Sequence, residues 1–441
     1  MTPAAPPPAC SIPREPGDLR GSILIAPGGS SFRRLLVFLG PGYLVATGYM
    51  DPGNWATALA GGSKYGAALL FVAVLSSLMA VVLQALAARL GLGAGLDLAQ
   101  ACRVHFPRPV GVGLWLVAEA AILATDLAEI IGTAIGLQLL FGLPLAGGIV
   151  VTLLDTFLVL AFERAGFRKI ELFVVALLGL IAISFSAQLA MANVDFAYVA
   201  KGLLPTPEFF SDPEMLYLGL GILGATVMPH NLFLHSYIVQ TRAVGASRGE
   251  KSEAIRFAVI DSTIALLFAL LINGAILVLA ASVFFASGHK EVAELGEAYR
   301  LITPLLGAPM ASTLFAVALI ACGLNSTVTA TLAGQVVMEG FLRLRLKPAT
   351  RRFVTRLIAI APAVAITLYY GESATGRLLV ASQVVLSLAL PFAVLPLLWF
   401  TSSRRVMGEF VAPHFLTMLA GVIAAAIVVL NAKLVYDAVA G

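Results

Sequence analysis

Two polar motifs stand inside segments that are otherwise apolar enough to cross a lipid bilayer. Residues 48–54 read Gly-Tyr-Met-Asp-Pro-Gly-Asn and include the carboxylate of Asp51 and the amide of Asn54. Residues 224–231 read Gly-Ala-Thr-Val-Met-Pro-His-Asn and include the thioether of Met228. Each of these groups can bind a metal cation, so together they predict a cation site within the membrane.

A proline stands in each motif at a position where a helix would have to continue. Pro52 and Pro229 have no backbone N–H, so each should break its helix. The carbonyls of Gly48 and Ala225 then lack the N–H four residues further on, and they become free to bind a cation. Because broken helix at membrane depth persists only inside protein or beside a cavity, we expect both breaks to lie in the protein interior.

The ligand types indicate which ions such a site would prefer. Asp51 and Asn54 lie within one helical turn, so their hard oxygens can converge on one ion. The thioether of Met228 is a soft ligand, which favours transition metals over Mg²⁺ and Ca²⁺. We therefore expect a divalent transition ion such as Mn²⁺ or Fe²⁺. The alternatives are that Asp51 is only an N-cap, that Asn54 is a turn residue and that Met228 fills the core.

Two histidines follow in the second motif and just after it. His230 could be a metal ligand, a proton acceptor or a buried histidine with satisfied hydrogen bonds, and we favour proton handling. It lies two residues beyond Met228, so the two side chains would leave a helix on roughly opposite faces. We interpret His235 as structural.

The third apolar segment carries three carboxylates, Glu119, Asp126 and Glu129. Glu119 and Asp126 are seven residues apart and share a helix face, and Glu129 follows one turn later. Ionisable groups inside a membrane are candidates for a proton relay. A buried ion pair with a basic residue such as Arg356 is the other interpretation, and the two roles are compatible.

The elements that must position these groups are membrane helices. Of the 441 residues, 59% are hydrophobic and only 12% are charged, whereas a soluble domain carries about 25% charged residues. Apolar segments lie near residues 36–60, 65–88, 112–141, 146–162, 170–191, 215–239, 257–286, 309–340, 355–370, 376–400 and 411–437. Most of them reach the roughly 17–25 residues that a spanning helix needs, and 146–162 and 355–370 are the shortest. The sequence therefore predicts an all-α membrane protein with eleven transmembrane helices.

The residues before the first segment are rich in proline. The longest apolar run there, Ile23 to Ala26, is too short for the roughly 7–15-residue core of a signal peptide. We expect residues 1–34 to be a disordered cytoplasmic tail and residues 35–437 to form a single transmembrane domain. The three cysteines are scattered, so they indicate neither a disulfide framework nor a metal motif.

The basic residues indicate the orientation. With the N-terminus inside, 22 of the 28 Lys and Arg fall in cytoplasmic stretches. This bias predicts a cytoplasmic N-terminus and a C-terminus on the outside. The formal net charge of +4 is then a topology signal. Because the basic residues lie in short loops between spans, the charge indicates no binding to nucleic acid, and no obligate protein partner is evident.

The order of the segments predicts an internal symmetry. The two breaks fall in the first and sixth segments, so counting from each gives two blocks of five, 36–191 and 215–400, with 411–437 added at the end. An odd number of spans per block makes the second block inverted relative to the first. Interrupted segments at matching places in two halves are typical of the substrate site of an inverted-repeat transporter.

These motifs resemble the paired signatures of the Nramp family (natural resistance-associated macrophage proteins), which are proton-coupled importers of divalent metals. The resemblance covers about residues 36–437. It rests on Asp-Pro-Gly-Asn at 51–54 and Met-Pro-His at 228–230, with further similarity at 125–129, 334–341 and 382–387. Where many members carry a glutamine in the eighth segment, this chain reads Gly-Leu-Asn-Ser-Thr.

The resemblance implies a leucine-transporter-like fold, alternating access and, for bacterial members, uptake of Mn²⁺. It implies metal ligation by Asp51, Asn54 and Met228, with backbone help from Ala225 and, in other states, from Gly48 and Gln383. It also implies a proton pathway through His230, Glu129, Asp126 and Arg356.

We therefore expect a proton-coupled importer of Mn²⁺ and Fe²⁺ in the bacterial plasma membrane, with no cofactor and no enzymatic activity. One alternative is an organic-cation or amino-acid carrier of the same fold, against which the transition-metal ligand set argues. Another is an intramembrane metalloenzyme, but the chain has no His-Glu-x-x-His motif. A passive channel is a third alternative, and uptake against a gradient would decide it.

Overall fold

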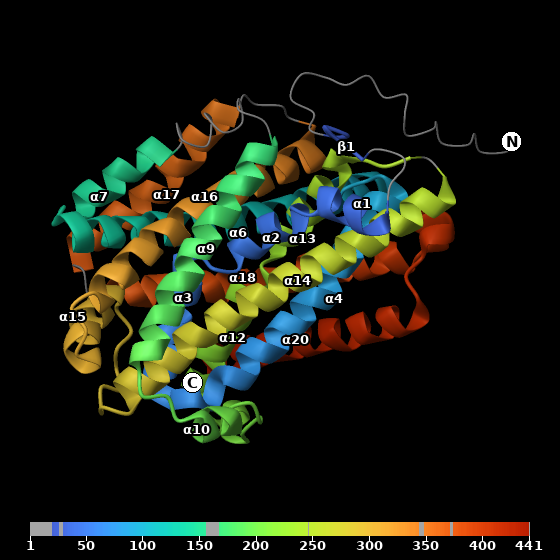
Figure 1. Cartoon of the computed structure of the whole chain (residues 1–441). Helices are drawn as coiled ribbons and strands as arrows, with labels where there is room; N and C mark the ends of the chain where they lie inside the picture. The colour runs from blue at the N-terminus through green and yellow to red at the C-terminus, as the bar shows by residue number, and fades with distance from the viewer. Residues whose placement is uncertain are drawn as a thin grey trace, which may run out of the picture.

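The computed structural model describes residues 20–25, 30–155, 167–245, 247–343, 348–370 and 374–440 of the chain. Its described part is almost entirely helical, and its long helices pack side by side in one bundle (Figure 1). A two-stranded parallel pairing of β1 (Ile23–Leu24) with β2 (Arg242–Ala243) is the sheet structure among these residues.

In the first half of the chain the helices have the following bounds: α1 Ser31–Phe38, α2 Pro41–Gly48, α3 Pro52–Tyr65, η1 Gly66–Leu69, α4 Leu70–Ala94, α5 Leu98–His105, α6 Arg108–Phe141, α7 Leu145–Val151, η2 Thr152–Leu154, α9 Phe167–Met191, α10 Phe196–Lys201 and α11 Glu208–Ser211. In the second half they are α12 Pro213–Val227, α13 Pro229–Ile238, η3 Val239–Thr241, α14 Arg248–Ala280, the π-helix η4 Ala281–Phe285, α15 Leu295–Leu306, α16 Ala311–Leu342, α17 Pro348–Tyr370, α18 Thr375–Ser402, α19 Arg404–Met407, η6 Gly408–Phe410 and α20 His414–Ala440.

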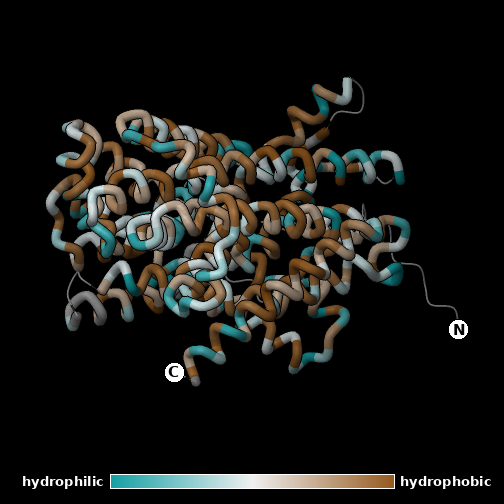
Figure 2. Tube along the Cα trace, turned by 90° about the horizontal axis from the view of Figure 1, so that it is seen from below, coloured by the Kyte–Doolittle hydropathy of each residue, from teal (hydrophilic) through white to brown (hydrophobic). Residues whose placement is uncertain are grey.

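Eight helical stretches among the described residues are long and apolar enough to span a membrane, and two shorter apolar helices accompany them. Large apolar side chains on their outer faces are exposed, among them Leu172, Leu271 and Phe415, each at least 70% exposed. Hydrophobic residues, coloured brown, recur throughout the bundle (Figure 2). Apolar surface of this extent on so many helices fits lipid and would be a liability in water.

The two shortest predicted segments have different outcomes. The segment predicted at 146–162 begins as α7 and η2, and its residues from 156 onward lie outside the described part. The segment predicted at 355–370 belongs to α17, which starts seven residues earlier, at Pro348. The count of eleven spans and the inverted relation of the two blocks stay predictions.

Both helix breaks lie at the centre of the bundle. The pieces on either side of them, α2, α3, α12 and α13, are almost wholly buried, whereas α6 and α20 expose much of their surface. α12 packs against α3 and α18, and α13 packs against α4 and α16. The polar motifs are therefore held among protein helices and away from the outer surface, as expected for broken helix at this depth.

Part of the segment predicted as a disordered tail has a defined place. Residues 20–25 lie against the chain that follows α13, and α1 already begins at Ser31. Gly21 N donates to Gln240 O at 2.9 Å, and Ile23 pairs with Arg242. The backbone at 240–243 supplies hydrogen-bond partners to this part of the segment, which composition does not reveal. Residues 1–19 and 26–29 of the predicted tail lie outside the described part.

Candidate metal centre

The first break falls between α2 and α3, as the position of Pro52 predicts. Asp51 is the N-cap of α3, and its Oδ1 accepts a hydrogen bond from the backbone N–H of Asn54 at 2.8 Å. The second oxygen, Oδ2, accepts from Nε2 of Gln383 on α18 at 3.1 Å. Asp51 is thus a helix cap, and the same buried carboxylate reaches a second predicted site residue.

The backbone around this break is held by side-chain amides. The carbonyl of Tyr49 accepts hydrogen bonds from Nδ2 of Asn54 and, at 2.7 Å, from Nδ2 of Asn273 on α14. The carbonyl of Met50 accepts from the thiol of Cys322 on α16. Because Nδ2 of Asn54 is used in this way, its Oδ1 is the atom of that side chain that can meet a cation.

The second break falls at Met228, between α12 and α13. Met228 has φ 39° and ψ 105°, a left-handed conformation that L-residues rarely adopt, and its side chain is fully buried. Its N–H donates to Gly224 O at 3.1 Å, and Pro229 opens the next helix. Backbone strain of this kind costs about 1–3 kcal/mol and is typical of functional sites.

The two breaks lie next to each other. The hydroxyl of Tyr49 lies 3.5 Å from the carbonyl of Val227, so the first break touches the second. A Cβ on Gly224 would lie 2.1 Å from the backbone oxygen of Gln383, and one on Gly53 would lie 1.8 Å from its Nε2. Gln383 therefore fits between both broken segments, and only glycine permits these close approaches.

The structure thus places the predicted site residues at one centre. Asp51, Asn54 and Gln383 share hydrogen bonds at the first break, and Gly48, Ala225 and Met228 flank the two breaks. The described residues include no group of three or more His, Cys, Asp or Glu side chains that could hold a metal ion. A cation here would depend on a mixed set of one carboxylate, amide oxygens, a thioether and free carbonyls, which suits transition metals.

The two histidines of α13 have different surroundings. His235 Nδ1 lies 2.9 Å from Oε1 of Gln84, and Nε2 of Gln84 donates to the hydroxyl of Tyr49 at 2.7 Å. This chain of contacts ties α13 to α4 and to the first break, which agrees with a structural role for His235. His230 is fully buried, and its Nδ1 has no hydrogen-bond partner among the described residues.

A buried charge network surrounds Arg356 of α17. Its Nη1 lies 3.5 Å from Oε2 of Glu129 and 3.8 Å from Oδ1 of Asp126, both on α6. Its Nη2 contacts Oδ2 of Asp155, at the end of η2. The guanidinium is fully buried, and the three carboxyl groups are nearly so. Of the residues expected in the relay, Asp126 and Glu129 therefore lie together with Arg356, in a salt-bridge network of the kind we named as the alternative. The ion pairs of Arg356 described above involve neither Glu119 nor His230 of the expected set.

The sequence reasoning missed Asp155. The signal was a carboxylate inside an apolar segment, the same signal that identified Asp126, but it fell in the short segment 146–162. Hydroxyl groups of α16 complete the network: Ser326 donates to Glu129 Oε1 at 2.8 Å and Thr327 donates to Oε2 at 3.0 Å. Both residues belong to residues 323–327, the stretch that departs from the family pattern, and their hydroxyl groups donate hydrogen bonds to a buried carboxylate. Glu119 is half-buried and accepts from Trp115 Nε1 at 3.2 Å.

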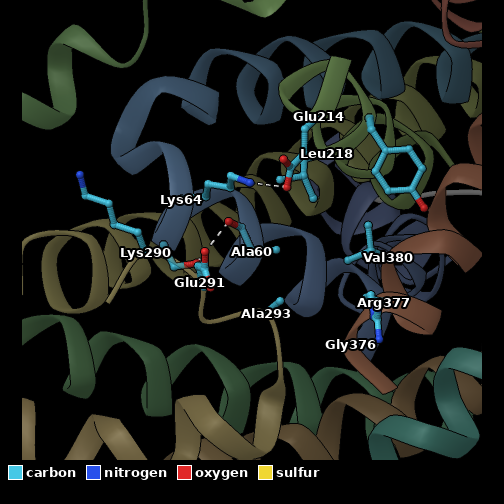
Figure 3. A pocket seen from close by; sticks show the side chains of 12 residues that line it. Ala60, Lys64, Glu214, Leu218, Lys290, Glu291, Ala293, Gly376, Arg377 and Val380 are labelled. Carbon is cyan, nitrogen blue, oxygen red and sulfur yellow. Dashed lines mark hydrogen bonds and ion pairs between the residues drawn. The ribbon is translucent and has the colours of Figure 1, made fainter. Parts of the chain in front are cut away.

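A cavity of about 490 Å³ lies at one end of the broken helices (Figure 3). It is lined by the last turns of α3, the start of α12, the loop at 290–293 and the start of α18. Lys64 and Glu214 form an ion pair of 2.5 Å across it. Asp51 is fully buried and is not among the residues that line this cavity, and Thr57 of α3 packs against the bare Cα of Gly221 on α12. The centre is therefore closed off from this cavity.

Comparison with known proteins shows to which family the chain belongs. The family model described as natural resistance-associated macrophage protein-like (Nramp) matches residues 42–437. The chain belongs to the Nramp family. The divalent metal cation transporter MntH of Agrobacterium fabrum is 60% identical over 420 residues, which cover 95% of this chain and 91% of the relative. The MntH of Brucella suis is 58% identical over 420 residues, covering 95% and 92%.

Solved structures of Nramp and related folds agree with this membership. The crystal structure of the Eremococcus coleocola manganese transporter has a TM-score of 0.86 and 42% sequence identity, covering 94% of this chain and 89% of that one. Mhp1, a nucleobase-cation-symport-1 family transporter, matches with a TM-score of 0.61 at 17% identity, covering 86% and 81%. The second likeness shows the fold alone. The fold of this Nramp chain is that of a leucine-transporter-like membrane protein.

Proposed function

We propose that this chain is a secondary transporter that imports divalent transition-metal ions, chiefly Mn²⁺ and also Fe²⁺, together with protons. The observation that carries the proposal is the pair of adjacent helix breaks, which gather a carboxylate, amides and a thioether in the protein interior. The names of the MntH relatives and of the manganese transporter support metal as the cargo. In this proposal the N-terminus lies in the cytoplasm and the C-terminus lies outside a bacterial plasma membrane, as the positions of the basic residues predict.

Each residue of the centre has a role in this proposal. Asp51 and Asn54 supply hard oxygens, and Met228 supplies the sulfur that favours transition metals. The carbonyl of Ala225 has no helical donor because residue 229 is proline, so it is free to complete the shell. Gly48 and Gln383 contribute in other states of the transport cycle, when the helices around the breaks have moved.

Proton movement in this proposal uses a route apart from the metal. A carboxylate ligand must release any proton before it binds a cation well. His230 follows Met228 by two residues on α13, and Asp126, Glu129 and Asp155 form a separate network around Arg356 of α17. Polar groups held inside a membrane protein in this way are typical of proton pathways.

The direct test of the centre is Mn²⁺ uptake into proteoliposomes by the Asp51→Ala and Asn54→Ala variants. Both should lose most or all uptake while still inserting and purifying normally, because each removes a hard oxygen from the buried set. Asp437→Ala is the matched control, since it removes a carboxylate on α20 that pairs with Lys433 far along the chain. Uptake by Asp51→Ala close to that of the control would refute the assignment of the centre.

Uptake driven by a pH gradient separates a transporter from a channel. Vesicles with equal Mn²⁺ on both sides and an acidic exterior should accumulate Mn²⁺ if protons and metal move together. A channel would only equalise the two concentrations. The closed centre, in which Asp51 and Met228 have no solvent exposure, favours the transporter. A carrier of organic cations would instead show uptake of such cations that Mn²⁺ does not inhibit.

A further inference from the structure

The side chain of Asn231 crosses from the second helix break to the first. It lies on the first turn of α13 and is fully buried. Its Nδ2 is 3.5 Å from the carbonyl of Val45 on α2 and 3.6 Å from Sδ of Met228. A Cβ on Gly48 would lie 2.3 Å from this nitrogen, so the amide is seated against the bare Cα of that glycine. One amide therefore contacts both halves of the candidate centre.

The orientation of this amide is fixed by its neighbours. α2 tightens in its last turn, where Tyr49 N donates to Ala46 O at 3.1 Å in place of Val45 O. The carbonyl of Val45 and the sulfur of Met228 are both acceptors. An amide oxygen turned toward them would be repelled, so the NH₂ group must face the pair. The Oδ1 atom then points elsewhere, and it has no hydrogen-bond partner among the described residues.

A buried acceptor without a partner is uncommon and costly, and it calls for an explanation beyond packing. We propose that Asn231 is a positioning residue for the metal centre, which holds the thioether of Met228 so that its remaining lone pair is directed at the bound ion. This inference rests on the proposed function. Nothing in it requires Asn231 itself to touch the metal.

The physical basis is the flexibility of methionine. Its unbranched side chain has three rotatable bonds, so an unrestrained thioether samples several positions. An N–H contact to one lone pair reduces that freedom and leaves the other lone pair available. Ordering a ligand before binding lowers the entropy lost when the ion arrives. The benefit falls only on ions that use sulfur, so Asn231 should affect selectivity more than general affinity.

A double-mutant cycle with Met228 tests this role. Affinities for Cd²⁺, Mn²⁺ and Ca²⁺ would be measured by calorimetry on the purified full-length protein with Asn231→Leu, Met228→Ala and both changes. Leucine has nearly the shape of asparagine and removes both polar atoms. We expect Asn231→Leu to weaken Cd²⁺ and Mn²⁺ binding relative to Ca²⁺ by about three- to tenfold, the effect of one hydrogen bond. In the Met228→Ala background the same change should have no further effect on this ratio.

Asn273→Leu is the matched control, because Asn273 donates to the Tyr49 carbonyl at the same break, whereas the sulfur of Met228 accepts from Asn231. It should affect all three ions alike and add to Met228→Ala. Asn231→Ala serves the same cycle should the leucine variant be unstable. Equal weakening of all ions by Asn231→Leu, or effects that add to those of Met228→Ala, would overturn the positioning role alone. A wild-type protein that binds neither Cd²⁺ nor Mn²⁺ would overturn the proposed function as well.

Discussion

Arg356 faces three carboxyl groups inside the membrane domain, and this imbalance bears on proton movement. Asp126, Glu129 and Asp155 all approach one guanidinium, and hydroxyl groups of α16 satisfy Glu129 further. Carboxyl groups in excess of cations at a buried site can exchange a proton among themselves. A site that only needed to stabilise the fold could manage with one such pair or with apolar residues.

Substitution of Glu129 should therefore change proton flux more than metal binding. In liposomes, Glu129→Ala and Asp126→Ala should lower internal acidification per Mn²⁺ taken up, because each removes a carboxyl group from the network. Mn²⁺ affinity should change much less, since neither residue shares a hydrogen bond with Asp51. A pH-sensitive dye inside the vesicles and parallel Mn²⁺ uptake give both quantities. Unchanged acidification per Mn²⁺ in both variants would leave α6 with a structural role only.

At this scale the sequence predicted residue types well and side-chain contacts less well. Asp51, Met228 and the two prolines were identifiable because polar or helix-breaking residues are conspicuous in apolar segments. Asp155 was equally conspicuous, but its segment is short. Asn231 was visible as a polar residue, yet its reach to Val45 depends on how α2 ends. Contacts of that kind arise from packing between segments about 190 residues apart, which no local pattern contains.

The ends of the helices are set by capping groups beyond the apolar stretches. α14 starts at Arg248, nine residues before the predicted segment, because Ser247 and Glu250 form a capping box. α17 likewise begins before its apolar part and includes Arg356, whose charge is matched inside the protein. Hydropathy therefore located the helices correctly. The segments predicted from it are shorter than the observed helices where a helix continues into charged turns, which pair with other helices or extend past the lipid.

The short element β1 and the loop before α5 form a pH-sensitive anchor for the N-terminal segment. Arg20 lies 3.6 Å from Asp97, the N-cap of α5. Burial raises the pKa of Asp97 to about 6, against the opposing effects of the Gln100 N–H and of nearby Arg20 and Arg103. Asp97 is thus charged at pH 7.5 and holds Arg20, and it takes up a proton below about pH 6, which removes the ion pair.

Residues 20–25 should consequently become less protected at pH 5 than at pH 7.5. Hydrogen exchange, corrected for the intrinsic effect of pH on exchange rates, measures this protection. Asp97→Asn is the control, because an amide keeps the cap and carries no charge at either pH. The variant should show the weaker protection at both values. Equal protection of the wild-type segment at both pH values would mean that the β1–β2 pairing alone holds it.

For the molecule as a whole, the buried network makes stability depend on Arg356. Removing one partner of a buried ion pair typically costs about 3–5 kcal/mol, since the other charge is left unpaired. Arg356→Leu should therefore lower the melting temperature in detergent clearly, and Asp155→Asn added to it should recover part of the loss. Arg377→Leu, at an exposed position, should change stability by no more than about 0.5 kcal/mol. Equal melting of Arg356→Leu and Arg377→Leu would contradict a stabilising network.

The whole-molecule architecture was the most predictable level. A chain with so few charges has to place its helices in lipid, and two broken segments within it have to lie inside the bundle. Both expectations are confirmed, as is the family. The count of spans and the inverted symmetry of residues 36–191 and 215–400 stay predictions. Hydropathy gives neither the tilt of a helix nor the direction in which it crosses the membrane.

The distance along the chain between the network's partners has a consequence for biogenesis. α6 delivers Asp126 and Glu129 to the bilayer more than 220 residues before Arg356 emerges from the ribosome. Until then, these carboxyl groups have no guanidinium to face, and a charge in the bilayer centre costs about 2.5–3.5 kcal/mol on insertion scales. We therefore expect the packing around these carboxyl groups to be completed only after α17 has joined the earlier helices. A nascent chain that stops before α17 would carry Asp126 and Glu129 without the guanidinium that pairs with them in the complete protein.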